Sequence, residues 1–286
     1  MSILYPFIYL LLGYLLGKTR LDLKNAFSLI LTKLAIPVVI VWNVAMYADQ
    51  ITWIIISTLL ITLLLFLISH AISKSAIQSL CFCYLNIGWL GLPIALALLG
   101  DQAARIMLAA YIGSSIFGNS IGANYLSSES ISLRKILLSP PIIALLLGCG
   151  LIPFNNTVAQ YGLEIYQLSK FLMGLLGMTV LGIWLSATII TRKHMLSNAM
   201  AYLTRIGLFF SALFLFAYLT DLLGWHFVAN NIEVLLLICL LPPAANIIVL
   251  ETHYRGSGES ATKISCETIL SIGAIVLYGI IITYVI

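Results

Sequence analysis

The sequence predicts an all-α integral membrane protein with ten transmembrane helices. Of its 286 residues, 62% are hydrophobic and only 8% are charged, and the mean hydropathy is +1.10. Soluble domains carry about 25% charged residues, so this composition excludes the soluble class. Because one crossing takes about 20 apolar residues, the chain has room for roughly ten spans with short loops and for no soluble domain.

Ten apolar stretches follow one another, separated by short segments that hold most of the charged and turn-forming residues. The predicted spans are 3–17, 27–47, 52–72, 77–100, 105–126, 136–153, 166–190, 200–223, 232–254 and 262–284. No basic region precedes the first stretch and no small-residue cleavage site follows it, which favours a retained span over a removable leader. The five cysteines fall within spans, where apolar packing is the expected role.

Basic residues in short loops indicate which side of the membrane each loop occupies, because they stay cytoplasmic. With the N-terminus outside, every Lys and Arg except Arg105 and Lys170 falls on the inner side, Arg205 included. Both chain ends are therefore predicted to face away from the cytoplasm. This asymmetry also accounts for the net charge of +4. The basic residues are scattered singly over several loops, so no nucleic-acid partner is expected.

Two apolar stretches long enough to cross a bilayer are interrupted by helix-breaking residues and an amide. The interruptions are Asn86–Pro93, with the sequence Asn-Ile-Gly-Trp-Leu-Gly-Leu-Pro, and Pro242–Asn246, with the sequence Pro-Pro-Ala-Ala-Asn. Backbone polar groups at membrane depth must be satisfied internally, so a break persists only where protein or a water-filled cavity covers it. Matched breaks in the two halves of a chain indicate the binding site of a transporter.

The number of spans per half predicts the symmetry of the fold. Five is odd, so two similar halves must insert with opposite orientation. The sequence thus predicts an inverted repeat, with a first five-span repeat over 1–126, a short cytoplasmic linker over 127–135 and a second five-span repeat over 136–286. Faint internal similarity agrees with this, because Pro6–Gly13 and Pro141–Gly148 both end in Leu-Leu-Leu-Gly.

The residues at the breaks suit an anionic ligand. Pro93 lacks an N–H and frees backbone groups of the preceding turn, while glycines let that backbone bend. A half-helix that begins near Pro93 would aim its positive dipole end at the membrane midplane, and Pro243 is expected to act likewise. Amide side chains both donate and accept, so they suit a carboxylate or exposed carbonyls. The predicted substrate-binding residues are Asn86, Gly88, Gly91, Pro93, Pro243 and Asn246.

The first interruption, Asn86–Pro93, followed by Ile94–Gly100, resembles the fourth-span signature of the auxin efflux carrier family. The bacterial branch of that family is similar to the plant PIN auxin exporters. Three further segments agree with the resemblance, namely Leu11–Leu16, Leu137–Gly148 and Leu241–Asn246. The resemblance therefore covers nearly the whole chain, and the short linker favours a bacterial-type carrier.

This resemblance implies a ten-span fold in which the broken fourth and ninth spans cross at prolines near the substrate, here Pro93 and Pro243, beside the amides Asn86 and Asn246. It implies transport of small organic anions, auxin in plants and dicarboxylates in some bacteria. The crossing bundle would move against a scaffold of spans one, two, six and seven, through which a homodimer would form. The seventh span departs from the pattern, because it lacks a proline comparable to Pro37.

One acidic residue, Glu267, lies one turn into the last predicted span. An acidic side chain inside the membrane costs free energy, so its presence suggests a functional role. Glu267 is therefore the candidate for proton or sodium coupling. Alternatively, it pairs with Lys263 four residues earlier or faces water at the cytoplasmic end. The chain shows no Gly-rich phosphate loop, metal-ligand spacing or nucleophile elbow, so no enzymatic activity, metal or cofactor is expected.

The function that these patterns favour is secondary transport of a small carboxylate by alternating access, in the cell (inner) membrane. Two alternatives stay open. A sodium-coupled carrier of the bile-acid type also has crossing helices, but it needs acids as well as amides beside the crossing. A membrane sensor that keeps the carrier fold would bind a ligand without moving it.

Overall fold

The computed structural model describes residues 4–19, 23–127, 134, 137–255, 257 and 259–285. Within these residues every named element is a helix. Six helices are long and apolar enough to cross a membrane, which is the pattern of an all-α, multi-pass membrane protein. Of the predicted linker 127–135, only Ser127 and Arg134 are among the described residues.

The N-terminal part of the chain contains two long helices that each bend once. Its elements are α1 Leu4–Leu16, α2 Lys24–Ile30, the π-helical turn η1 Leu31–Ala35, α3 Ile36–Ser73, α4 Ala76–Cys83, the π-helical turn η2 Ile87–Gly91, α5 Leu92–Phe117, the π-helical turn η3 Gly118–Gly122 and α6 Ala123–Ser127. α3 bends at Tyr47, and α5 turns at Gly100, whose φ of +83° is readily adopted only by glycine. Both bends fall where hydropathy predicts a connection between spans.

The C-terminal part contains two helices that begin earlier than hydropathy predicts. Its elements are α8 Pro140–Leu151, the 3₁₀ turn η4 Ile152–Phe154, α9 Asn155–Ala187, α10 Arg192–Leu222, α11 Phe227–Asn230, α12 Ile232–Leu240, α13 Asn246–Arg255 and α14 Ser260–Val285. The predicted starts of 166 and 200 are too late for α9 and α10. Polar first turns lower hydropathy without stopping a helix, and the Thr191 side chain caps α10 by accepting from the His194 N–H at 3.2 Å.

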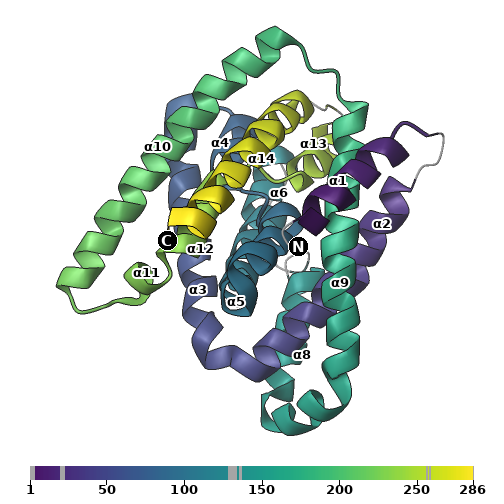
Figure 1. The fold of residues 1–286 in the computed structure, drawn as a ribbon, viewed down its shortest axis with the longest axis vertical. Coiled ribbons are helices and arrows are strands. Elements are labelled where there is room, and N and C mark those ends of the chain that lie inside the picture. The colour runs from purple at the N-terminus through teal and green to yellow at the C-terminus, as the bar shows by residue number, and fades with distance from the viewer. Residues whose placement is uncertain are drawn as a thin grey trace.

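The helices form two groups. The close-packed group comprises α1, α2, α8, α9 and α3 up to Tyr47; α1 packs on α9, and α8 packs on α3. Figure 1 shows α1, α2, α8 and α9 on the right. Glycine permits this close approach, because a Cβ on Gly182 would lie 2.1 Å from the Leu10 carbonyl oxygen and one on Gly148 would lie 2.7 Å from Val44 Cβ. The crossing group comprises the rest of α3, α4 to α6 and α10 to α14.

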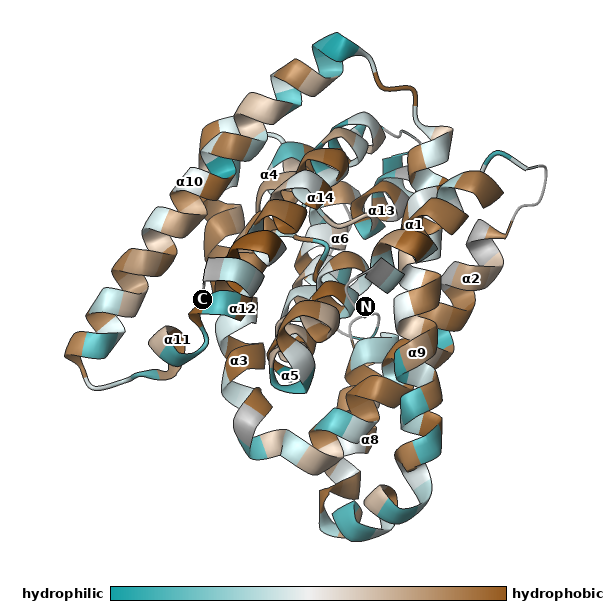
Figure 2. Cartoon of the chain, in the orientation of Figure 1, coloured by the Kyte–Doolittle hydropathy of each residue, from teal (hydrophilic) through white to brown (hydrophobic). Residues whose placement is uncertain are grey.

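The outer faces of the helices carry many large apolar side chains. Exposed examples are Leu146 on α8, Tyr161 on α9 and Leu215 on α10. Figure 2 shows largely hydrophobic or neutral colouring along α10, with hydrophilic colouring at its start and at isolated positions farther along the helix. Apolar surface on this scale is unfavourable in water and marks a membrane-facing surface.

Candidate binding site at two crossing helix breaks

The two interrupted segments meet inside the crossing group. The first break is 84–86, between α4 and η2, and the second is 241–245, between α12 and α13. Leu85 and Pro243, one from each break, form an antiparallel β-bridge. Two segments far apart in the sequence therefore cross through their backbones.

Two backbone hydrogen bonds hold this crossing. The Asn86 N–H donates to the Pro242 carbonyl at 2.8 Å, and the Ala244 N–H donates to the Tyr84 carbonyl at 2.8 Å. Backbone groups that leave a helix must find partners when they are buried. The breaks satisfy part of this need for each other, which explains why they occur as a pair.

The first break precedes Pro93 rather than starting at it. The helix resumes at Ile87, directly after Asn86, and continues through the proline into α5. The Leu92 N–H donates to the Ile87 carbonyl, five residues earlier, which is the wide turn of a π-helix. A widened turn accommodates a proline ring that would clash in a regular helix. The expectation that the half-helix begins near Pro93 is therefore wrong, and Asn86 stands at its start.

A cavity of about 360 Å³ lies against the crossing. Its polar lining residues are Thr32, Tyr84, Asn86, Tyr111, Ser115, Asn119, Ser139, Asn246 and Tyr254. None of the described residues that line it is an acid or a base. Its volume fits a small organic ligand, and its recognition groups are amides, hydroxyls and helix starts rather than side-chain cations.

Asn86 is the most distinctive residue of this lining. Its side chain is buried, and within the described residues its Nδ2 has no hydrogen-bond partner. A buried donor without a partner costs free energy, of the order of 1–3 kcal/mol. Asn86 lines the cavity, so a ligand whose acceptor atom reached this nitrogen would remove the cost, and Asn86 is a candidate binding group.

Asn246 occupies the corresponding place as the first residue of α13. Its Nδ2 lies 3.4 Å from the Tyr84 hydroxyl and 3.4 Å from Asn119 Oδ1. Asn119 in turn donates to the Ser115 carbonyl and hydroxyl at 2.9 and 3.0 Å. Amides thus stand at the start of both half-helices, one with an unpartnered Nδ2 and one hydrogen-bonded into a chain of polar side chains.

The other predicted site residues divide between the cavity and its surroundings. Gly88 lines the cavity, and a Cβ there would lie 2.5 Å from the Tyr111 ring. Gly91 lies outside the lining, where a Cβ would lie 2.7 Å from Leu241 Cδ1. Pro243 forms the bridge and likewise lies outside the lining. The glycines therefore permit close approach, while Pro243 shapes the crossing.

Pro93 lines a separate, smaller cavity of about 40 Å³ together with Asn43, Asp101, Arg105 and Lys170. Lys170 on α9 forms an ion pair with Asp101 on α5, which joins the two helix groups. Arg105 and Lys170 are the two basic residues predicted on the outer side, so the structure brings them together at one small cavity.

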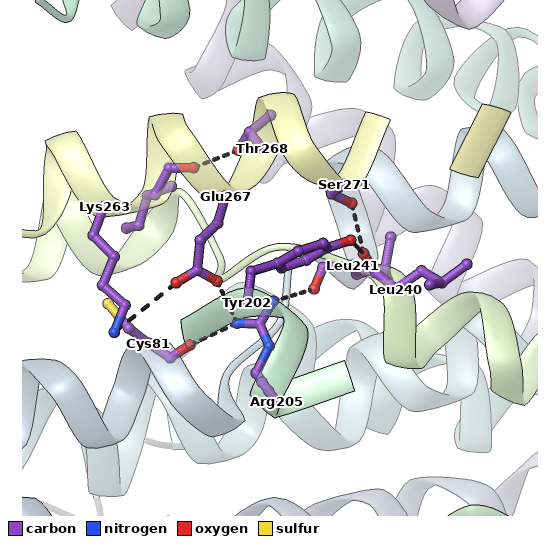
Figure 3. Close-up of polar contacts among 10 residues, drawn as sticks. Cys81, Tyr202, Arg205, Leu240, Leu241, Lys263, Glu267, Thr268 and Ser271 are labelled. Carbon is purple, nitrogen blue, oxygen red and sulfur yellow. Dashed lines mark hydrogen bonds and ion pairs between the residues drawn. The ribbon is translucent and has the colours of Figure 1, made fainter. Parts of the chain in front are cut away.

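Sequence reasoning missed the role of Arg205. This residue, counted from the sequence only among the inner-side basic residues, is 3% exposed and lies inside the protein. Its Nη1 donates to the Cys81 carbonyl at 3.0 Å and its Nη2 to the Leu241 carbonyl at 2.9 Å. Figure 3 shows the guanidinium between these oxygens and Glu267, whose Oε2 lies 2.8 Å from Nη1. Lys263, the predicted partner of Glu267, is farther from it at 3.9 Å.

The signal that finds this pair is present in the sequence. Arg205 and Glu267 are opposite charges inside two predicted apolar spans, 200–223 and 262–284, and intramembrane charges pair with one another. Counting Arg205 only as a marker of sidedness hid that relation.

The geometry offers no metal centre among the described residues, because no group of three or more His, Cys, Asp and Glu side chains there could hold a metal ion. The chain matches no protein-family model and no curated protein. The features that bear on function are therefore the crossing, its cavity and the Arg205–Glu267 pair.

Proposed function

We propose that the protein is a secondary transporter that moves a small organic anion, of the carboxylate class, across a membrane by alternating access. The observation that carries this proposal is the meeting of two chain breaks beside a cavity that the unpartnered Asn86 amide lines. The start of a half-helix carries partial positive charge, and an amide N–H there is a suitable donor to a carboxylate oxygen. Broken helices at a shared binding site are typical of transporters.

The proposal includes ten spans arranged as two inverted repeats, 1–126 and 136–286. Bends at Tyr47 and Gly100 would divide α3 and α5 into two spans each, and the turn Ile152–Phe154 would separate α8 from α9. The packing supports this reading, because α1 packs on α9 while α8 packs on the first part of α3. In the proposed repeats α1 corresponds to α8, and the first part of α3 corresponds to α9. The first span of each repeat therefore packs on the second span of the other, as inverted symmetry requires.

The cavity location supports an inward-facing state. The cavity is lined by Ser139, just before α8, and by Tyr254, near the end of α13. The distribution of basic residues predicts that both lie near the cytoplasm. On the opposite side, the Asp101–Lys170 pair joins α5 to α9. We assign this pair to the closed outer path.

Transport would then proceed by displacement of the crossing group against the close-packed group, which contains spans one, two, six and seven of the proposed order. The resemblance to auxin efflux carriers supports this division and a carboxylate substrate. Coupling to protons or sodium, location in the cell inner membrane, both termini outside and a homodimer through the close-packed group belong to the same proposal.

The sodium-coupled alternative is weaker at this site. It requires acids beside the crossing, whereas none of the described residues that line the cavity is acidic. Glu267 lies near the breaks, but its carboxylate is paired with Arg205. Sodium-independent transport would remove this alternative, and specific binding without flux would favour the sensor.

The test is counterflow of labelled carboxylates into proteoliposomes that are preloaded with the same unlabelled acid. The panel should contain aromatic monocarboxylates, short dicarboxylates and the neutral amide of each acid, with protein-free liposomes as the blank. We expect at least one acid to accumulate transiently and its amide not to accumulate. No accumulation of any acid by folded protein would overturn the proposal.

A further inference from the structure

We propose that Arg205 is a positioning residue for the crossing, and that Glu267 serves as its counterion rather than as the coupling group. The inference rests on the proposed function only where its test uses transport. Its structural basis is one buried guanidinium that contacts both broken helices and one acid at the same time (Figure 3).

The two carbonyls that Arg205 binds lie beside different breaks, one just before the first break and one at the start of the second. Cys81 lies in the last turn of α4, and Leu241 is the first residue after α12. Carbonyls at the end of a helix lack intrahelical donors. A planar guanidinium presents several N–H groups in a fixed fork, so a single side chain from α10 can satisfy one carbonyl in each broken helix and fix the distance between them.

Neighbouring side chains complete the same arrangement at the second break. The Tyr202 hydroxyl donates to the Leu240 carbonyl at 2.7 Å, and the Ser271 hydroxyl donates to that carbonyl at 2.6 Å. Tyr202 lies one turn before Arg205 on α10, and Ser271 lies one turn after Glu267 on α14. The helices α10 and α14, neither of which contains a break, therefore hold the end of α12 through side-chain donors.

Glu267 compensates the buried positive charge of Arg205. The side chains of Arg205 and Glu267 are only 3% and 2% exposed, and a buried charge without a partner is strongly unfavourable. Neither residue lines the 360 Å³ cavity. The pair therefore acts on a ligand only through the backbone that carries Asn86 and Asn246.

The informative variant replaces both charges. Arg205→Met alone would leave the buried Glu267 with only the more distant, partly exposed Lys263 as a counter-charge, which can prevent folding for a reason unrelated to the crossing. The double variant Arg205→Met, Glu267→Met removes both charges and keeps apolar volume. Arg205→Lys keeps a positive charge beside Glu267 but loses the planar guanidinium that donates to two carbonyls at once. Arg192→Met, at an exposed position of the same helix, is the matched control.

The first measurement is hydrogen–deuterium exchange, which needs no substrate. Peptides that cover 84–91 and 241–248 report the crossing, and a peptide from 163–183 in α9 reports the close-packed group. In the folded double variant we expect exchange at both breaks to be faster by about tenfold, since hydrogen bonds to charged groups contribute about 1.5–3 kcal/mol, with no change in α9. Arg205→Lys should be intermediate and Arg192→Met should match the wild type.

The second measurement is the KM for whichever acid the wild type exchanges. The double variant should raise that KM by about tenfold while proton or sodium dependence, if present, persists. Wild-type deuterium uptake at both breaks in the folded double variant would overturn the positioning role. Loss of ion dependence in the double variant would return Glu267 to coupling. If the wild type moves no acid, the proposed function fails, but the deuterium result still decides the role of Arg205.

Discussion

The close-packed group and the crossing group differ in how their helices are joined. In the close-packed group, backbone approaches backbone: a Cβ on Gly13 would lie 2.0 Å from the Thr179 carbonyl oxygen, and one on Gly182 would lie 2.1 Å from that of Leu10. The crossing group also has such an approach, because a Cβ on Gly113 would lie 2.4 Å from the Ile55 carbonyl oxygen. Its chain, however, leaves helical geometry twice, and polar side chains from α10 and α14 bind the carbonyls that the second break frees.

The difference indicates where function can reside. Close packing of unbroken helices has little freedom, because a shift of either helix creates overlap or empty volume. Polar contacts at a break can exchange partners, and the break places amides and helix starts against a cavity. The comparison predicts that substitutions in the close-packed group away from the cavity change stability alone, whereas substitutions in the crossing group at the cavity also change ligand binding.

The largest expected effect comes from leaving one buried charge unpaired in the crossing group. Glu267→Leu should destabilise the protein by about 3–5 kcal/mol, because Arg205 then stays buried without its counterion. Thermal unfolding in detergent measures this, with Glu164→Leu at an exposed position of α9 as the control. Wild-type stability of Glu267→Leu would show that the ion pair does not hold the crossing.

A smaller effect is expected from overpacking the close-packed group. Gly182→Ala places a Cβ against the Leu10 backbone, and overpacking of this kind typically costs about 1–3 kcal/mol. Gly174→Ala on the same helix meets nothing within 4 Å and should be neutral or slightly stabilising. Unfolding temperatures of both variants test this. A change in KM for Gly182→Ala without a stability loss would contradict the division between the groups.

A comparable substitution at the cavity should change binding more than stability. Gly88→Ala places a Cβ 2.5 Å from the Tyr111 ring, which must then move. Because both residues line the cavity, we expect the KM of the transported acid to rise by about tenfold, as small misplacements at a site allow. Gly273→Ala on α14, with nothing within 4 Å, is the control. Equal KM values for both variants would place the ligand elsewhere.

The smallest effect on stability is expected where the two groups are joined by charge. The Lys170 and Asp101 side chains are 28% and 68% exposed, and exposed ion pairs contribute about 0–1 kcal/mol. Asp101→Asn should therefore change stability by less than about 1 kcal/mol, and the change should shrink in high salt. Unfolding at low and high salt measures this. A large, salt-independent loss would mean that this pair, and not packing, joins the groups.

Much of the fold could be predicted because hydropathy and helix-breaking residues are local signals. The sequence located the interruptions, the connections near Tyr47 and Gly100, and the amides at both breaks. It misplaced the start of α9 and α10, because polar first turns look like loops. It also misplaced the first half-helix, because the π-helical turn before Pro93 depends on packing that no local pattern encodes.

The candidate site was predicted in part. Asn86, Gly88 and Asn246 line the cavity, whereas Gly91, Pro93 and Pro243 do not. The meeting of the breaks was predicted from symmetry and resemblance. Its hydrogen bonds could not be predicted, because they depend on the three-dimensional arrangement of the two segments. The role of Arg205 was missed because one residue bonds to two chain segments 124 and 36 positions away. Such long-range pairing leaves no periodic trace in the sequence.

The measurement that tests the central claim most directly is equilibrium binding of the labelled acid that exchanges fastest, to detergent-purified wild type, Asn86→Ala and Asn198→Ala. Asn198 lies on α10, where its amide donates to the His194 carbonyl. Loss of a hydrogen bond to a carboxylate costs about 1.5–3 kcal/mol, so the account predicts a Kd at least about tenfold higher for Asn86→Ala and unchanged for Asn198→Ala. Equal Kd values for wild type and folded Asn86→Ala would contradict it.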